Sequence, residues 1–143
     1  MIKEFITAAI ATICFSLIFG APKKYYPLCG LIGALSWVMY IGLLDVGLSD
    51  TESIFITTVV IIILSRIAAV RCRCPVTVFL IAGIIPLVPG AGIYWSAYYL
   101  VTNQFALAAD KGFLAFKAAI AIVLGIVIVF EFPQKWFRIG MKK

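Results

Sequence analysis

The stretch from Ile84 to Gly92 reads Ile-Ile-Pro-Leu-Val-Pro-Gly-Ala-Gly and lies inside an apolar run that is too long for one membrane crossing. Proline removes a backbone donor and clashes with the preceding turn, and glycine lowers the cost of leaving helical geometry. In lipid, each freed backbone group needs a new partner, so such a break persists only where protein or a water-filled cavity surrounds it. Two interpretations are open: a binding site at the bilayer midplane, as transporters build it, and a purely structural kink.

The composition defines the class of protein. Hydrophobic residues make up 64% of the 143 residues, charged residues make up 13%, and the mean hydropathy is +1.15. A soluble domain of this length could not bury so much apolar surface. The chain is therefore an integral membrane protein. Because a spanning helix needs about 20 apolar residues, we expect an all-α fold of five transmembrane helices, with residues 1–143 forming one transmembrane domain.

The predicted spans follow the hydrophobic runs between turn signals. Ser49 and Glu52 have the spacing of a capping box that opens the third span. The segment Asp110-Lys111-Gly112 is expected to close the loop before the fifth span. The five spans are Phe5–Phe19, Tyr26–Leu44, Ile54–Val70, Val76–Val101 and Phe113–Phe130, with the fourth broken at Pro86–Gly92.

The distribution of charge predicts the orientation in the membrane. Basic residues gather in the first connection, the third connection and the C-terminal tail, which five crossings put on one side. Acidic residues fill the second connection, on the other side. Since positive residues mark the cytoplasmic face, we expect an N-terminus outside and a C-terminus in the cytoplasm. A re-entrant hairpin at Val76–Val101 would instead move the tail outside. The basic residues are Lys23, Lys24, Arg71, Arg73, Lys135, Arg138, Lys142 and Lys143, and the acidic ones are Asp45, Asp50 and Glu52.

The sequence offers few groups for catalysis or metal binding. The sequence contains no histidine, the commonest general base and metal ligand. Cys72 and Cys74 form one short Cys-x-Cys motif, whereas a structural zinc ion needs four ligands. We therefore expect no catalytic residues, no metal and no cofactor. The net charge of +6 orients the protein against anionic lipid and implies no nucleic-acid partner.

The break itself predicts a polar binding site. Pro89 suits the first position of a helix, because its missing donor would be unpaired there in any case. A half-helix that starts at Pro89 would present the amides of Gly90, Ala91 and Gly92 at its positive end, a site for a carboxylate. The preceding half-helix would end near Ile85, where its carbonyl groups favour an ammonium group. The break could thus hold an amino acid, or one carboxylate of a dicarboxylate.

Two further residues are candidates for substrate contact. Tyr94 follows the break at helical spacing, where it could line a cavity or belong to an aromatic belt at the outer interface. Arg66 lies about a turn and a half from Arg71 in an apolar span. Its charge could reach the cytoplasmic interface along its flexible stem, or it could face the transport pathway.

The pattern around the break resembles a known family. Pro86-x-x-Pro89-Gly90 follows a Val-Phe-Leu-Ile-Ala-Gly run, an early Phe-Gly-Ala-Pro turn precedes the second span, and the third span ends in Ser65-Arg66. These features resemble the small subunit of bacterial threonine/serine exporters, equivalent to the C-terminal half of fused ThrE-type exporters. The resemblance covers nearly the whole chain. Of the candidate residues, it carries over Pro86, Pro89, Gly90 and Arg66.

The resemblance implies a function and a partner. Such proteins work in the bacterial inner membrane with a larger membrane subunit that resembles the ThrE N-terminal half. They export threonine and serine or, in some members, succinate-like dicarboxylates. We therefore expect a hetero-oligomeric secondary transporter. The competing interpretation is a non-transporting scaffold or accessory subunit, in which the broken helix would be only a packing kink.

Overall fold

The computed structural model describes residues 2–133, and every regular element in that part of the chain is helical. The all-α expectation is confirmed. Short 3-10 turns at Lys23–Tyr25 and Ile85–Leu87 lead into α2 and extend α4. The helices are α1 (Ile2–Ile18), α2 (Tyr26–Asp45), α3 (Asp50–Cys72), α4 (Thr77–Ile84), α5 (Gly90–Val101) and α6 (Phe105–Glu131).

The number of membrane crossings is confirmed only in part. Three segments are long and apolar enough to cross a membrane: Lys23–Asp45, Asp50–Cys72 and Phe105–Glu131. Thr77–Leu87 and Gly90–Val101 together form a fourth candidate, bent by 51° at the break. The first helix has 17 residues, short of the roughly 20 that a full crossing needs. The described residues therefore contain three or four candidate spans, where the sequence predicted five.

The ends of the helices follow the expected turn signals. Gly20 and Gly47 adopt positive φ angles of 70° and 99° just after α1 and α2, a conformation that glycine reaches without strain. The capping box of α3 is confirmed. The Ser49 hydroxyl accepts a hydrogen bond from the Glu52 amide at 3.4 Å, and the Glu52 carboxylate accepts one from the Ser49 amide at 3.0 Å.

The expected loop at residues 110–112 is wrong, because α6 already begins at Phe105. The segment before Asp110 contains alanine and leucine, which favour a helix, and it packs on α5. The Ser96 hydroxyl donates to the Ala108 carbonyl at 2.8 Å. A Cβ atom at Gly112 would lie 2.9 Å from the Ser96 Oγ, so α5 and α6 approach closely here. These contacts extend α6 toward α5 beyond the predicted start of the fifth span.

Helices α1 to α4 form one packed unit. The first two pair closely at Gly33, where a Cβ atom would lie 2.1 Å from the Thr12 Oγ1. A buried cluster joins α2, α3 and α4 around Phe79, which is fully buried. The cluster consists of Tyr25, Cys29, Ile32, Ile61, Ala69, Phe79 and Ala82.

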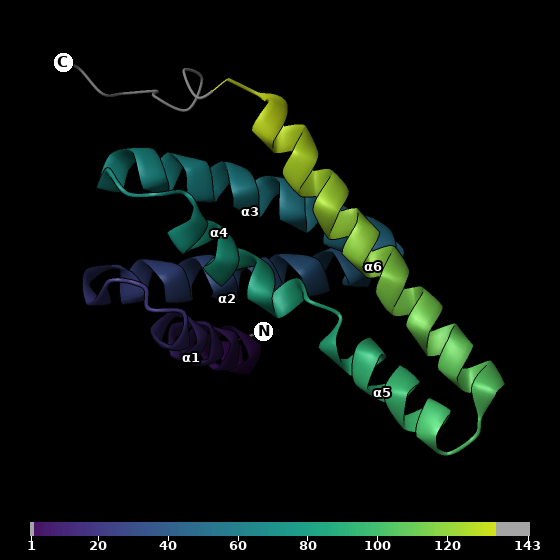
Figure 1. Cartoon of the computed structure of the whole chain (residues 1–143). Coiled ribbons are helices and arrows are strands. Elements are labelled where there is room, and N and C mark those ends of the chain that lie inside the picture. The colour runs from purple at the N-terminus through teal and green to yellow at the C-terminus, as the bar shows by residue number, and fades with distance from the viewer. Residues whose placement is uncertain (1, 134–143) are drawn as a thin grey trace.

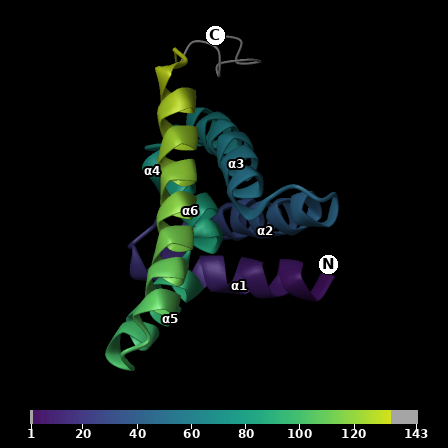
Figure 2. The same cartoon turned by 90° about the vertical axis from the view of Figure 1, so that its right-hand side faces the viewer.

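The last helix crosses α3 obliquely and continues past the end of the α2–α3 pair, together with α5 (Figure 1). Figure 2 shows the same arrangement from the side, with α3 near one end of α6 and α5 beside the other. Thr58 contacts Gly125, where α6 lies against α3. None of the residues of α5 is buried. A second buried cluster, at the crossing, consists of Ile54, Leu87, Ala118, Ala121 and Ile122.

Candidate functional site

The helix break lies where the sequence predicts it. The α4 helix ends at Ile84, a single 3-10 turn follows, and Val88 is extended with ψ 127°. Pro89 is the N-cap residue of the next helix, whereas the sequence predicted it as the first helical residue. The first helical residue is Gly90, so α5 begins one residue later than predicted. Proline has no amide hydrogen, so neither Pro86 nor Pro89 can donate to a carbonyl one turn back. The two prolines therefore account for the interruption.

A cavity of about 260 Å³ lies at this break. It is smaller than the roughly 300–1,000 Å³ of pockets for drug-sized ligands, a size suited to a small metabolite. Five of the predicted site residues, Pro86, Pro89, Gly90, Ala91 and Gly92, line this one cavity. The other lining residues are Trp37 and Tyr40 of α2, Asp50 and Ile54 of α3, Leu87, Val88, and Leu114, Ala115 and Ala118 of α6.

Asp50 gives the cavity its charge. It is the one residue with a formal charge among those that line the cavity. The Tyr40 hydroxyl donates a hydrogen bond to the Asp50 Oδ1 and so links α2 to the start of α3. The capping box fixes the backbone beside Asp50, which stands at the positive end of the α3 dipole. The cavity thus presents a carboxylate that an ammonium group could pair with.

The start of α5 supplies the opposite polarity. The amides in the first turn of a helix have no carbonyl partner one turn back. The Gly90 amide instead donates to the Val88 carbonyl at 2.7 Å, and the Ile93 amide donates to the Pro89 carbonyl at 3.1 Å. The amides of Ala91 and Gly92 fall between these two in the first turn. This end of α5 therefore favours a carboxylate, while Asp50 favours a cation.

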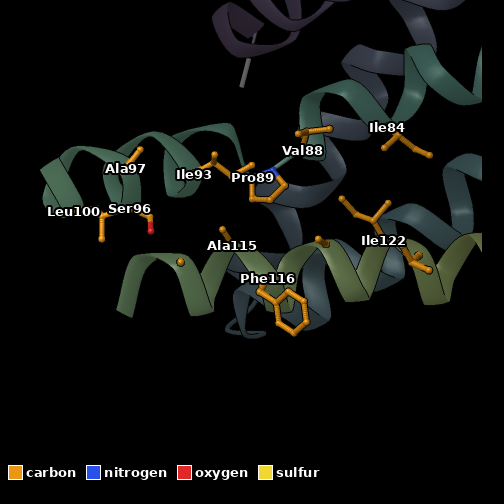
Figure 3. Close-up of a pocket in the computed structure, with 13 residues that line it drawn as sticks. Ile84, Val88, Pro89, Ile93, Ser96, Ala97, Leu100, Ala115, Phe116 and Ile122 are labelled. Carbon is orange, nitrogen blue, oxygen red and sulfur yellow. The ribbon is translucent and has the colours of Figure 1, made fainter. Parts of the chain in front are cut away.

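An apolar groove of about 660 Å³ lies on the other side of Pro89, between α5 and α6. Figure 3 shows Ile93, Ala97 and Leu100 on α5 and Ala115 and Phe116 on the neighbouring α6, with Pro89 at the start of α5. The lining of the groove is apolar apart from Ser96. The groove thus lacks a charged group such as Asp50, which makes the neighbouring cavity suitable for a polar solute.

Tyr94 does not line the cavity. It is 62% exposed and contacts the ring of Trp95, with the ring centroids 5.3 Å apart. Trp95 in turn contacts Tyr98 and Tyr99. Tyr94 therefore belongs to an outward-facing aromatic group on α5, which agrees with the interpretation as an interfacial belt.

Arg66 lies away from the break, at the other end of α3. It is 8% exposed and donates to the carbonyls of Val129 and Phe132, the latter at 2.9 Å. Its guanidinium carbon lies 5.3 Å from the centroid of the Phe130 ring. These carbonyls end α6, where a positive charge is favourable. The structure thus assigns Arg66 a contact that neither sequence interpretation included: it caps α6.

We expect Arg66→Gln to lower the amount of folded protein in the membrane. Hydrogen bonds to charged groups contribute about 1.5–3 kcal/mol each, and glutamine cannot reproduce two charged contacts. The exposed Arg71→Gln is the matched control and should leave the amount unchanged. Immunoblots of membrane fractions measure the amount, and export per molecule of protein is measured in parallel. A large loss of export at an unchanged amount would return Arg66 to the transport pathway.

The turns that carry basic residues meet at the same end of the molecule as Arg66. The Tyr25 hydroxyl donates to the Cys72 carbonyl at 3.0 Å, which joins the α1–α2 turn to the α3–α4 turn. Burial raises the pKa of the Cys74 thiol in this turn. The thiol therefore remains neutral at physiological pH, which agrees with a structural role. Asp50 and the cavity lie toward the opposite end of α3.

Sequence reasoning missed Trp37, Tyr40 and Asp50 as residues of the site. Asp50 was assigned only to an acidic connection, and Tyr40 carried no signal of its own. The spacing of Tyr40 and Asp50, ten residues apart across a short helical hairpin, could have indicated that they face each other. Their position beside Pro86–Gly92 depends on how α4 packs on α2, which no local pattern shows.

The arrangement defines a class: a polytopic membrane protein with a polar cavity at a broken helix, as in secondary transporters. The chain belongs to the threonine/serine exporter family, ThrE, whose sequence pattern matches residues 4–131. A probable threonine/serine exporter of Mycobacterium tuberculosis is 26% identical over 136 residues, which are 93% of this chain and 25% of that protein.

A second relative is an uncharacterized protein of Haemophilus influenzae, 30% identical over 94 residues, which are 66% of this chain and 32% of that protein. The chain therefore spans about a quarter to a third of the length of these curated relatives. No solved structure matches it.

Proposed function

We propose that this chain is the part of a secondary transporter that contributes a binding cavity for small polar amino acids of the threonine and serine type. The proposal rests on one observation: the cavity at the break contains both the Asp50 carboxylate and the start of α5. An amino acid carries an ammonium group and a carboxylate. The first would pair with Asp50, and the second with the amides of Ala91 and Gly92.

The same charge argues against dicarboxylates as the main substrate. A second carboxylate in the cavity would approach Asp50, and two like charges 4 Å apart repel by about 4 kcal/mol at an effective dielectric constant of 20. An amino acid meets no such repulsion. We therefore propose threonine or serine over a succinate-like substrate.

We also propose that a larger membrane subunit completes the transporter. Two observations support this. The chain matches only about a quarter of the mycobacterial relative, and α5 buries none of its residues against the described part of the chain. The polar backbone at the break would be costly in contact with lipid. A partner that covers it would remove that cost.

The proposed location is the bacterial inner membrane, with the N-terminus outside and the C-terminus in the cytoplasm. The basic turns that contain Lys24 and Arg71 adjoin each other, since Tyr25 bonds to Cys72. The end of α6 also lies there, beside Arg66. The acidic turn before α3 lies at the other end. This separation of charge supports the orientation by the positive-inside rule.

The experiment is an export assay on cells that make this chain with and without the proposed larger subunit. Extracellular threonine, serine and succinate are measured after loading the cells. We expect Asp50→Asn to lower amino-acid export about tenfold at an unchanged amount of protein. The variant loses the charge that pairs with the ammonium group, and a loss of about 1.4 kcal/mol in that interaction corresponds to a factor of 10. It should not lower succinate export.

Glu52→Gln is the matched control, since Glu52 lies in the same turn but does not line the cavity. Wild-type amino-acid export by Asp50→Asn would contradict the assigned role. Equal export from cells that lack this chain would leave it as a scaffold. Export by this chain alone would remove the need for a partner.

A further inference from the structure

Three hydroxyl groups on α2 and α3 are buried without a hydrogen-bond partner among the described residues. They belong to Ser36, Ser53 and Thr57, each of which is 0% exposed. Serine and threonine in helices often donate to the carbonyl one turn back. Elsewhere in this chain they do so: Ser16 bonds to Thr12 at 2.8 Å, and Thr102 bonds to Tyr98 at 3.0 Å. The three buried hydroxyls thus require an explanation.

The contacts of Gly83 define how α2 and α3 face each other. A Cβ atom at Gly83 would lie 2.3 Å from the Ile61 Cγ2 and 3.0 Å from the Ile32 Cγ2, so these two isoleucines meet over this glycine. The α2 and α3 helices run in opposite directions along a short hairpin. Ser36 lies one turn after Ile32, and Thr57 lies one turn before Ile61. Ser36 and Thr57 therefore face each other across the same seam.

The seam leads to the cavity. One further turn along each helix brings α2 to Tyr40 and α3 to Ser53. Tyr40 lines the cavity, and so does Ile54, the neighbour of Ser53. The hydroxyls of Ser36, Ser53 and Thr57 therefore form a row that runs along the α2–α3 seam away from the cavity. The row ends where Ile32 and Ile61 meet over Gly83.

Polar groups within a membrane are costly unless they pair or face water. Thr58, which is also buried and unpaired, has a simpler explanation. It packs at the crossing with α6, where a Cβ atom at Gly125 would lie 2.9 Å from the Thr58 Cγ2. Threonine serves there as a small side chain at a close helix contact. Thr57 is not among the nearest neighbours of any glycine in the described part of the chain.

We infer that Ser36, Ser53 and Thr57 line the inward continuation of the substrate path, and that Ile32 and Ile61 over Gly83 form its closed gate. The path would take a small hydrated zwitterion, whose polar groups replace the missing hydrogen-bond partners. On the other side of the gate, Ser65 continues the same face of α3, and its Oγ lies 3.7 Å from the Cβ position of Gly83. This inference rests on the proposed transport function and adds the route to it.

The test compares two adjacent residues on α3. Single cysteines replace Thr57 or Thr58 in the complete exporter, after Cys14, Cys29, Cys72 and Cys74 have been changed to serine. A small charged methanethiosulfonate is added to intact cells. We expect Thr57→Cys to react at least ten times faster than Thr58→Cys, and we expect excess external threonine to slow that reaction. Rates within a factor of two of each other would overturn the path.

The gate has its own measurement. Ser65→Cys lies beyond the gate and should resist the external reagent, but it should react when Ile61→Ala is added. Failure of Ile61→Ala to expose it would overturn the gate.

Export by the chain with its native cysteines gives a second readout. Thr57→Val keeps the shape of the side chain and removes the hydroxyl, so we expect it to lower threonine export several-fold while Thr58→Val does not. Equal export by the two valine variants would contradict the path. A further outcome is that the wild-type protein exports no threonine while Thr57→Cys still reacts at least ten times faster than Thr58→Cys. In that case the proposed function is wrong and the inferred path is supported.

Discussion

A chain in which Pro86 and Pro89 are both replaced by alanine is expected to enter the membrane and to export nothing. Proline costs about 3 kcal/mol relative to alanine inside a helix, so the double change favours a continuous helix by about 6 kcal/mol. The opposing contacts are those between α5 and α6, which include the Ser96–Ala108 hydrogen bond but leave every residue of α5 at least partly exposed. The helix should therefore straighten, and the amides of Ala91 and Gly92 would then bond within it. The cavity would lose its site for a carboxylate.

Export per molecule of protein and the amount of protein in the membrane fraction measure this result. Insertion should be unaffected, because alanine keeps the segment apolar. Pro27→Ala is the matched control, since Pro27 lies in the first turn of α2, where proline is tolerated. Wild-type export by the double variant would reduce the break to a packing kink and would remove Pro86 and Pro89 from the site.

We expect Gly33→Ala to prevent α1 from packing on α2. The added Cβ atom would lie 2.1 Å from the Thr12 Oγ1 and 2.7 Å from the Thr12 Cβ, so the helix backbones must separate. Overpacking of this kind costs about 1–3 kcal/mol and occasionally more, which exceeds the gain of about 1 kcal/mol from replacing a helical glycine. The amount of folded protein extracted in mild detergent, measured by size-exclusion chromatography, should fall severalfold.

Gly42→Ala gives the control within the same helix, because nothing lies within 4 Å of its Cβ position. It should leave the amount of folded protein unchanged or raise it. Adding Thr12→Gly to Gly33→Ala removes the side chain that the new methyl group would overlap and should recover most of the loss. No recovery in the double variant would show that the close contact between α1 and α2 is not the cause.

The sequence predicts the features that depend on local chemistry. The break follows from the missing donors of Pro86 and Pro89, and the capping box at Ser49 and Glu52 follows from hydrogen bonds within one turn. The end of α4 is predicted to within one residue. The helix after the break begins one residue later than predicted, since Pro89 is its N-cap residue.

The features that the sequence could not predict join distant parts of the chain. Arg66 bonds to Phe132, 66 residues away, so no local pattern distinguishes capping of α6 from contact with lipid or substrate. Asp50 enters the site only because α4 packs beside α2 and brings the break to it. Asp110 and Lys111 indicated a loop, but the packing of α5 on α6 keeps them in a helix. Charge and turn signals are weaker than such contacts.

The helices of this protein differ in length by more than one bilayer can accommodate without adjustment. At 1.5 Å per residue, the 27 residues of α6 extend about 40 Å, and the 17 residues of α1 about 26 Å. The hydrocarbon core is about 30 Å thick. A helix that is too long tilts, and one that is too short thins the surrounding lipid. The oblique course of α6 over α3 (Figure 1) is an adjustment of the first kind. Because α6 forms one wall of the cavity, the chain length of the surrounding lipids should change the tilt of α6 and, with it, the shape of the cavity.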